Sequence, residues 1–256
     1  MGFLDAAPPL AFAHRGYAPD GEENSLAAFE RAVGLGYRYL ETDVRVTADG
    51  VALAFHDARL DRLTDRRGVV AELTWAQVRH ARIGGREPIP LLADVLAAWP
   101  RTRVNLDVKS AAAIGPTVDA IRRTASIDRV CVASFSGARI GAVRRVLGPS
   151  LCTALGPRDA LGLRAASALH RRGSPGPGYC VQVPARIGRF PLVDARYLAT
   201  AHRLGLQVHV WTVNSRAEMV RLLELGVDGI MTDRAELLRA VLLERGQWVG
   251  TGDRPG

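Results

Sequence analysis

Two stretches of the sequence place polar side chains at every second position of otherwise apolar segments. Glu41 and Asp43 lie in Leu-Glu-Thr-Asp-Val, and Asn105, Asp107 and Lys109 lie in Asn-Leu-Asp-Val-Lys. Residues two apart in a β-strand share a face, so each stretch is expected to direct its polar groups to one side. Carboxylates gathered in one confined site would repel one another and lose hydration unless a cation compensates their charge.

The three carboxylates form an all-oxygen set of candidate ligands. Such a set suits Mg²⁺ or Ca²⁺, whereas zinc usually takes sulfur or clustered histidine ligands. We therefore predict one divalent cation, Mg²⁺ or Ca²⁺, bound by Glu41, Asp43 and Asp107. The alternative is that these acids pair with nearby arginines or with Lys109 and bind no metal.

Two histidines end apolar segments and face the loops that follow. His14 precedes Arg15 and Gly16, and His56 precedes Asp57. A lone histidine is more often a structural residue, but two of them at strand ends beside carboxylates point to chemistry. Histidine both accepts and donates a proton near neutral pH, as hydrolysis of a diester requires at the attacking and leaving oxygens. We predict that one acts as base and the other as acid.

Two basic residues could hold a phosphate group. Arg15 offers a planar fork, although an ordinary surface ion pair is the alternative, and Lys109 offers a point charge. Lys109 is the only lysine in a chain that otherwise uses arginine. Weaker signals come from Gln182, Trp211 and Asn214, which end two later strands and are predicted to line the substrate pocket. A packing role for Trp211 is equally open.

Short β-branched runs alternate with amphipathic stretches along the whole chain, and this pattern predicts repeated βα units. Eight strands are expected, at Leu10–His14, Tyr37–Val44, Arg103–Val108, Val130–Ser134, Leu151–Ala154, Tyr179–Val183, Gln207–Thr212 and Gly229–Thr232. Helices are expected between them, for example at Leu26–Gly34, Leu91–Trp99, Pro116–Thr124, Gly137–Leu147, Ala195–Leu204 and Ala217–Leu225. The fold class is therefore α/β, a closed (β/α)₈ barrel.

Glycines at 34–37, 204–206 and 225–227 can take the left-handed conformation that ends a helix and leads into the next strand. Residues 51–90 do not fit a simple βα unit, because they hold an extra strand at Val51–Phe55, a loop rich in Arg and Asp, and a short helix near Thr74–His80. This insertion either covers the catalytic face or decorates the periphery. We expect one domain over residues 1–245, followed by a mobile tail at 246–256.

Composition limits the classes of partner. The 256 residues are 48% hydrophobic and 23% charged, as in folded globular proteins. No apolar run approaches the roughly 20 residues of a transmembrane helix, and no secretory signal pattern begins the chain, so a cytoplasmic protein without membrane insertion is expected. The net charge of +8 comes from scattered arginines without a basic block, which disfavours a nucleic-acid partner and allows an anionic small-molecule substrate. Cys131, Cys152 and Cys180 are expected to be buried free thiols.

The chain resembles the glycerophosphodiester phosphodiesterases. An ordered set of motifs carries the resemblance through most of the chain: Ala-His-Arg-Gly (13–16), Glu-Asn-Ser (23–25), Glu-Thr-Asp-Val (41–44), His-Asp (56–57), Asn-Leu-Asp-Val-Lys (105–109), Trp-Thr-Val-Asn (211–214) and Gly-Val-Asp-Gly-Ile-Met-Thr-Asp (226–233). Each motif alone is weak, but the ordered set is specific.

The resemblance implies a (β/α)₈ barrel with a small insertion after the second strand. It implies hydrolysis of deacylated phospholipid head groups to glycerol 3-phosphate and an alcohol, in which the glycerol 2-hydroxyl attacks phosphorus and water then opens the cyclic phosphate. It also implies that Glu41, Asp43 and Asp107 bind the metal. His14 and His56 would then act as acid and base, and Arg15 and Lys109 would contact the phosphate.

The sequence departs from the family pattern at two places. Asp107 stands where the family usually has glutamate, so the metal ligand is one methylene shorter. Glu22 and Ser25 replace a frequent proline and threonine, although Ser25 can still cap the helix that follows. One alternative to glycerophosphodiester hydrolysis is a related lysophospholipase D or sphingomyelinase D-like activity. An apolar rim would favour such lipid substrates, but the insertion has few large apolar residues. The other alternative is a non-catalytic phosphate-binding or membrane-surface barrel.

Overall fold

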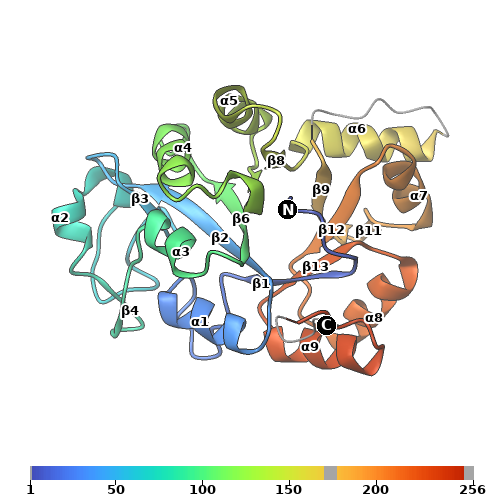
Figure 1. Cartoon of the computed structure of the whole chain (residues 1–256), viewed down its shortest axis with the longest axis horizontal. Coiled ribbons are helices and arrows are strands. Elements are labelled where there is room, and N and C mark those ends of the chain that lie inside the picture. The colour runs from blue at the N-terminus through green and yellow to red at the C-terminus, as the bar shows by residue number, and fades with distance from the viewer. Residues whose placement is uncertain (1, 170–177, 251–256) are drawn as a thin grey trace.

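The computed structural model describes residues 2–169 and 178–250, and its centre is a barrel of parallel strands (Figure 1). The strands are hydrogen-bonded in the order β8-β7-β6-β2-β1-β13-β12-β9, so each predicted strand is present. Their bounds are β1 Leu10–His14, β2 Tyr39–Val46, β6 Arg103–Val108, β7 Val130–Ala133, β8 Cys152–Thr153, β9 Cys180–Pro184, β12 Gln207–Trp211 and β13 Gly229–Thr232. The predicted α/β barrel is confirmed.

The barrel closes between β8 and β9 through sparse backbone pairing. An isolated bridge joins Ala154 to Cys180, Leu155 N donates to Cys180 O at 2.8 Å, and Tyr179 N donates to Thr153 O at 2.9 Å. By contrast, β2 and β6 pair continuously from Tyr39 to Val44 on β2. We call the β8–β9 boundary the seam of the barrel.

Helices cover the outside of the barrel (Figure 1). Their bounds are α1 Leu26–Gly34, α3 Leu92–Ala98, α4 Ile114–Arg123, α5 Gly137–Leu147, α6 Pro157–Ala168, α7 Ala195–Arg203, α8 Arg216–Leu225 and α9 Ala235–Glu244. A short 3₁₀ helix, η2 Ile127–Arg129, precedes β7, and a hairpin of β10 Arg186–Ile187 and β11 Phe190–Pro191 follows β9. Ser25 Oγ accepts a hydrogen bond from Ala28 N at 3.0 Å and caps α1, as predicted. The predicted left-handed glycines are also present, because Gly36, Gly205 and Gly226 have φ angles of 94°, 73° and 93°.

Apolar side chains fill the space between the helices and the sheet. Val181, Val208 and Val210 pack toward α7 and α8 in one large cluster, and Val104 and Leu106 pack toward α3 and α4 in another. A third cluster lies inside the barrel. The alternation of side chains along each strand therefore gives the barrel an apolar outer surface beneath its helices and reserves the inner surface for different residues.

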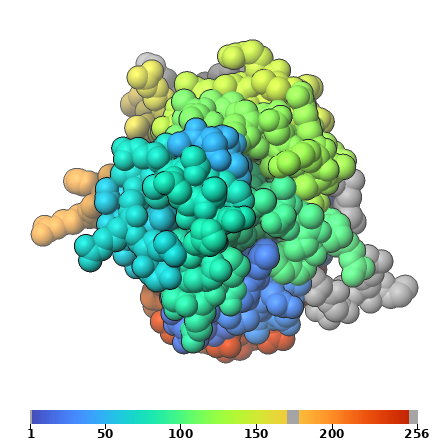
Figure 2. Space-filling view, turned by 90° about the vertical axis from the view of Figure 1, so that its left-hand side faces the viewer, coloured from blue at the N-terminus to red at the C-terminus, as the bar shows by residue number. Residues whose placement is uncertain are grey.

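The insertion at residues 51–90 is a small lobe at one side of the barrel (Figures 1 and 2). Its elements are β3 Ala52–Ala54, η1 Val70–Glu72, α2 Trp75–Val78, β4 Arg82–Ile83 and β5 Glu87–Pro88. β3 pairs with β2 in the antiparallel direction. The lobe buries a separate apolar core that includes Leu53, Phe55, Leu60, Val78 and Ile83.

The structure describes the first part of the segment predicted to be a mobile tail, as far as residue 250. Trp248 packs edge-on against Tyr37, with ring centroids 5.1 Å apart, and Arg239 lies over its ring. Residues 246–250 therefore lie against the barrel, because an indole ring buries apolar surface there; residues 251–256 lie outside the described part. None of the described helices combines the length and apolarity needed to cross a bilayer.

Candidate active site

A cavity of about 420 Å³ opens at the carboxyl ends of the barrel strands, where catalytic groups of such barrels collect. One wall is charged and the other is apolar. The charged wall comes from β1, β2, β6 and the insertion, and it consists of His14, Arg15, Glu41, Asp43, His56, Asp107 and Lys109. Within the described residues, only His56 reaches the cavity from the insertion. The insertion therefore flanks the cavity and does not cover it.

Basic side chains pair with the acids of the charged wall. Lys109 Nζ lies 2.6 Å from Asp43 Oδ1 and 2.6 Å from Asp107 Oδ2, and Arg15 Nε lies 3.1 Å from Asp43 Oδ2. Burial opposes ionisation of Asp43, but Lys109 and Arg15 together lower its pKa below the ordinary value. The ion pairs considered above as the alternative to metal binding are thus present.

Basic side chains do not fully balance the negative charge of two of the acids, Glu41 and Asp107. Burial, and then the charge of Asp43, raise the pKa of Glu41 to about 7. Burial also raises the pKa of Asp107, although Lys109 opposes this, and Asp107 Oδ1 is buried without a hydrogen-bond partner among the described residues. A hard divalent cation would satisfy both carboxylates, so the donors fit Mg²⁺ or Ca²⁺.

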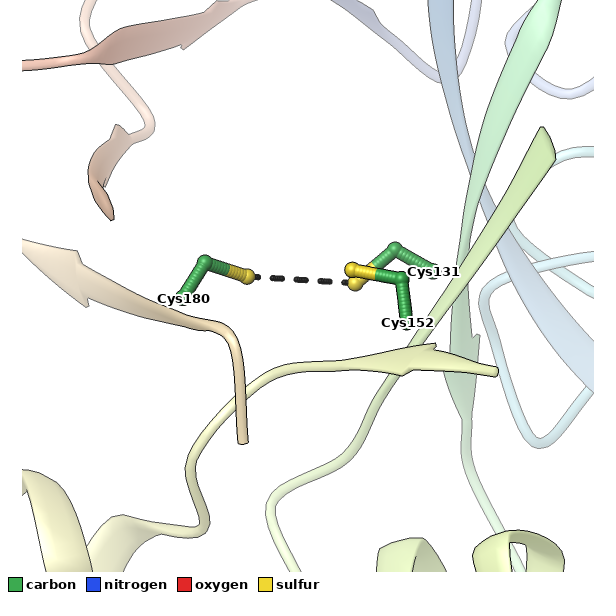
Figure 3. Close-up of side chains that lie close together, drawn as sticks. All are labelled: Cys131, Cys152 and Cys180. Carbon is green, nitrogen blue, oxygen red and sulfur yellow. Dashed lines mark hydrogen bonds between the residues drawn. The ribbon is translucent and has the colours of Figure 1, made fainter. Parts of the chain in front are cut away.

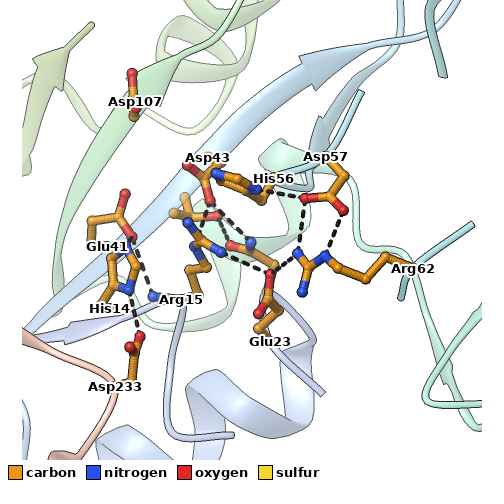
Figure 4. A network of polar contacts seen from close by, with 12 residues as sticks. His14, Arg15, Glu23, Glu41, Asp43, His56, Asp57, Arg62, Asp107 and Asp233 are labelled. Carbon is orange, nitrogen blue, oxygen red and sulfur yellow. Dashed lines mark hydrogen bonds and ion pairs between the residues drawn. The ribbon is translucent and has the colours of Figure 1, made fainter. Parts of the chain in front are cut away.

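The three predicted ligands do not form a closed group. Figure 4 shows Asp107 set apart from Glu41 and Asp43. Across residues 2–169 and 178–250, no three carboxylates place their oxygens all within 4.8 Å of one another. Asp107 ends one methylene nearer to its own strand than a glutamate would.

His14 is oriented by an acid that directly follows β13, the last strand of the barrel. Its Nδ1 lies 2.6 Å from Asp233 Oδ1, and its Nε2 lies 3.7 Å from Glu41 Oε2 (Figure 4). Although burial favours the neutral ring, Glu41 and Asp233 raise the pKa of His14 above the ordinary value. Asp233 Oδ2 in turn accepts a hydrogen bond from Asn214 Nδ2 at 2.7 Å.

His56 has a matching partner, which follows it directly in the sequence. Its Nδ1 lies 2.6 Å from Asp57 Oδ1. Arg62 donates to both oxygens of Asp57 through Nε and Nη2, at 2.6 Å and 2.8 Å, and its guanidinium holds the pKa of Asp57 well below the ordinary range. An acid at Nδ1 fixes the ring orientation and leaves Nε2 for proton exchange.

A strained turn after β1 places Arg15 in the charged wall. Arg15 has a φ of 55°, and its backbone N donates to Glu41 Oε2 at 3.2 Å. Gly16 follows with a φ of 83°, and a Cβ there would lie 2.7 Å from the backbone carbonyl carbon of Ala28. The turn therefore requires glycine at this position, and Arg15 Nη1 is held further by Glu23 Oε1 at 2.9 Å.

The three weaker sequence predictions have different outcomes in the geometry. Gln182 and Trp211 line the cavity, and Gln182 Nε2 donates to Asn105 Oδ1 at 2.8 Å. Asn214 is not among the lining residues; it binds Asp233 instead and thus lies behind His14. Asp57 and Asp233 were not predicted to have roles of their own, although both acids end motifs of the sequence, His-Asp (56–57) and Gly-Val-Asp-Gly-Ile-Met-Thr-Asp (226–233).

The apolar wall of the cavity comes from the segments that follow β7, β8 and β9, including α6 and the β10–β11 hairpin. Phe135 is 66% exposed, Leu161 55% and Ile187 52%, and the neighbouring Phe190 of the hairpin is 80% exposed. The ring of Phe135 meets Trp211 edge-on at a centroid distance of 5.6 Å. Exposed apolar groups beside a polar site indicate a contact surface. The insertion, in which few large apolar residues were noted, does not supply these groups.

Known proteins match both the sequence and the fold. The chain is 42% identical to "Probable glycerophosphodiester phosphodiesterase 2" of Mycobacterium tuberculosis over 97% of this chain and 96% of that protein. It is 30% identical to a glycerophosphodiester phosphodiesterase of Caldanaerobacter subterraneus over 90% and 96% of the two chains. A solved glycerophosphodiester phosphodiesterase from Agrobacterium tumefaciens superposes with a TM-score of 0.74 at 23% identity, over 91% of this chain and 98% of that one.

The family model extends across the elements that build the cavity. The glycerophosphoryl diester phosphodiesterase family matches residues 14–237, from the histidine that ends β1 to the start of α9 beyond Asp233. Because this match includes both walls of the cavity and both histidine–aspartate pairs, the chain belongs to the glycerophosphoryl diester phosphodiesterase family.

Proposed function

We propose that the protein hydrolyses glycerophosphodiesters to glycerol 3-phosphate and an alcohol. One observation carries this proposal: His14 and His56 reach the same charged cavity from different elements, and an acid holds Nδ1 of each ring. Two oriented imidazoles can serve the two oxygens whose bonds to phosphorus form and break in diester hydrolysis. Membership of the family supports the same substrate class.

The two rings divide the proton transfers. Hydrogen bonding of Nδ1 to Asp233 or Asp57 leaves each Nε2 free to exchange a proton with the substrate. One histidine takes the proton from the attacking hydroxyl group, which is the glycerol 2-hydroxyl or water, while the other gives a proton to the leaving alcohol oxygen. Loss of either ring should therefore stop turnover.

The charged wall would hold the phosphate. We infer that Glu41, Asp43 and Asp107 bind one divalent cation, Mg²⁺ or Ca²⁺, which when bound would neutralise charge on the phosphoryl oxygens. Arg15 and Lys109 place two further positive charges on the same wall, where fixed donors stabilise the charge of a phosphorane-like transition state. Lys109 already contacts two of the acids, so its position should depend on the cation.

The direct test is release of glycerol 3-phosphate from glycerophosphocholine in the presence of Mg²⁺ or Ca²⁺. His14→Ala and His56→Ala should each reduce kcat by at least ~10² while the affinity for the cation is retained. His202→Ala and His80→Ala are matched controls, because these histidines lie on the outer surface and not in the cavity. Full activity in either of the first two variants, or no product from any common diester with either cation, would refute the proposal.

The apolar wall favours a second candidate activity, which is cleavage of lysophospholipids to lysophosphatidic acid and a free head group. An acyl chain could lie along Phe135, Leu161 and Ile187 while the phosphate meets the charged wall. Leu161→Ser should then raise KM for lysophosphatidylcholine without changing KM for glycerophosphocholine. Leu243→Ser, at an exposed leucine of α9, is the control. Equal effects on both substrates would exclude this role.

A further inference from the structure

Three cysteines meet inside the barrel, and Figure 3 shows their sulfur atoms pointing toward one another. Cys131 lies on β7, Cys152 on β8 and Cys180 on β9, and their Sγ atoms all lie within 4.8 Å of one another. All three are buried and free, as the sequence predicted. Each lies two residues before a cavity-lining residue, so the group forms the layer directly below the part of the cavity floor made by Ala133, Ala154 and Gln182.

We propose that these three thiols bind one thiophilic divalent cation, of which Zn²⁺ is the physiological example. A zinc–sulfur bond is about 2.3 Å long, and tetrahedral geometry then places two bound sulfurs about 3.8 Å apart. Cys131 Sγ and Cys180 Sγ are 3.9 Å apart. These two sulfurs can therefore share an ion almost without movement, whereas a disulfide would require them to approach to about 2.0 Å.

The charge near the thiols favours a divalent ion over a monovalent one. Three thiolates and one divalent ion carry a single net negative charge. The guanidinium of Arg144, on α5, lies close enough to interact electrostatically with Cys152, and its Nε is buried without a hydrogen-bond partner among the described residues. Phe12 and Met231 surround the group with apolar surface, where an unbalanced charge is costly. Arg144 would balance the complex.

The location gives the ion a mechanical role. Cys152 and Cys180 lie on the two sides of the seam, where β8 is only two residues long and an isolated bridge replaces a continuous ladder. Cys131 belongs to the next strand. One ion would thus cross-link three strands at the part of the barrel with the sparsest backbone pairing. Gln182, which contacts both Cys180 Sγ at 3.9 Å and Asn105 Oδ1 at 2.8 Å, links this layer to the cavity floor.

Cadmium provides a readout that is specific for thiolate ligands. The whole protein is treated with a chelator, kept reduced with a phosphine, and titrated with Cd²⁺. We expect an ultraviolet sulfur-to-cadmium charge-transfer band that saturates at one equivalent. Carboxylate ligands give no such band, so binding in the catalytic cavity does not contribute. Asp43→Asn should retain the band, whereas Cys152→Ser should lose most of it.

A thermal measurement with Zn²⁺ tests the role at the seam. At a hundredfold excess over Kd, Zn²⁺ should raise Tm of the wild-type protein by about 5–10 °C, and this increase should be largely absent in Cys152→Ser. Absence of the charge-transfer band in the wild-type protein would overturn the proposal whether or not the variants fold. A band that persists unchanged in Cys152→Ser would also overturn it.

Discussion

Substitution of Glu41 by glutamine separates the requirements of the fold from those of the site. Glu41 is 4% exposed, and burial together with Asp43 raises its pKa from 4.5 to about 7. This shift means that the fold disfavours the ionised carboxylate by about 3 kcal/mol. Glutamine has nearly the same shape and can still accept the hydrogen bond from Arg15 N, but it carries no charge.

The sign of the effect follows from proton binding. Because the pKa of Glu41 is higher in the folded protein than in the unfolded chain, the folded protein keeps a proton that the unfolded chain has lost. Stability therefore falls as pH rises from about 4.5 to about 7. Glu41→Gln avoids this loss, so at pH 8 and without divalent cations it should be more stable by about 2–3 kcal/mol, and its Tm higher by roughly 5–10 °C.

Calorimetry in chelator at pH 8 and at pH 4.5 measures the difference. The increase in Tm should be present at pH 8 and nearly absent at pH 4.5, where the wild-type side chain is largely protonated. Added Mg²⁺ should then raise Tm of the wild-type protein at pH 8 much more than that of the variant, and the variant should lose most of its activity. Equal stability of the two proteins at pH 8, or an equal gain at both pH values, would refute the reasoning.

Three further predictions concern other parts of the site. Asp233→Asn should lower kcat about 10- to 100-fold. It should also move the limb of the pH–rate profile that belongs to His14 to lower pH, because the variant removes one of the charges that raise the pKa of His14. An unchanged profile would contradict the orienting role of Asp233. Asp107→Glu should lower the Mg²⁺ concentration for half-maximal activity several-fold, because the longer carboxylate reaches further, and calorimetric titration would detect the opposite result. Gly16→Ala should destabilise the fold by about 2 kcal/mol or more in urea unfolding, because its Cβ would meet the backbone of Ala28 at 2.7 Å; unchanged stability would show that the turn relaxes.

Most of the barrel could be predicted because each strand carries its own pattern. β1, β6 and β13 begin and end at the predicted residues, since β-branched runs between helix-ending glycines or polar turns mark both limits. β8 is shorter than predicted, spanning only Cys152–Thr153. The layout of the insertion could not be predicted, because its short strands depend on the small core that they bury together and not on local periodicity.

The sequence predicts which side chains point into the site, but not the distances between them. Alternation along β2 and β6 indicates which acids face inward, but it cannot show that Lys109 bridges two of them. Asp233 becomes the partner of His14 only because β13 pairs with β1 when the barrel closes. The meeting of Cys131 with Cys180 depends in the same way on the arrangement of strands that are far apart in sequence.

The separate core of the insertion has a consequence for how activity fails on heating. His56 directly follows Phe55, which belongs to the apolar core of the insertion lobe. His14, by contrast, is the last residue of β1 and so belongs to the barrel itself. Packing units with separate cores open with different free energies. Opening of the lobe alone would displace His56 while the barrel stays folded, so we expect thermal inactivation to precede unfolding of the barrel, and stabilising substitutions would be best placed in the lobe.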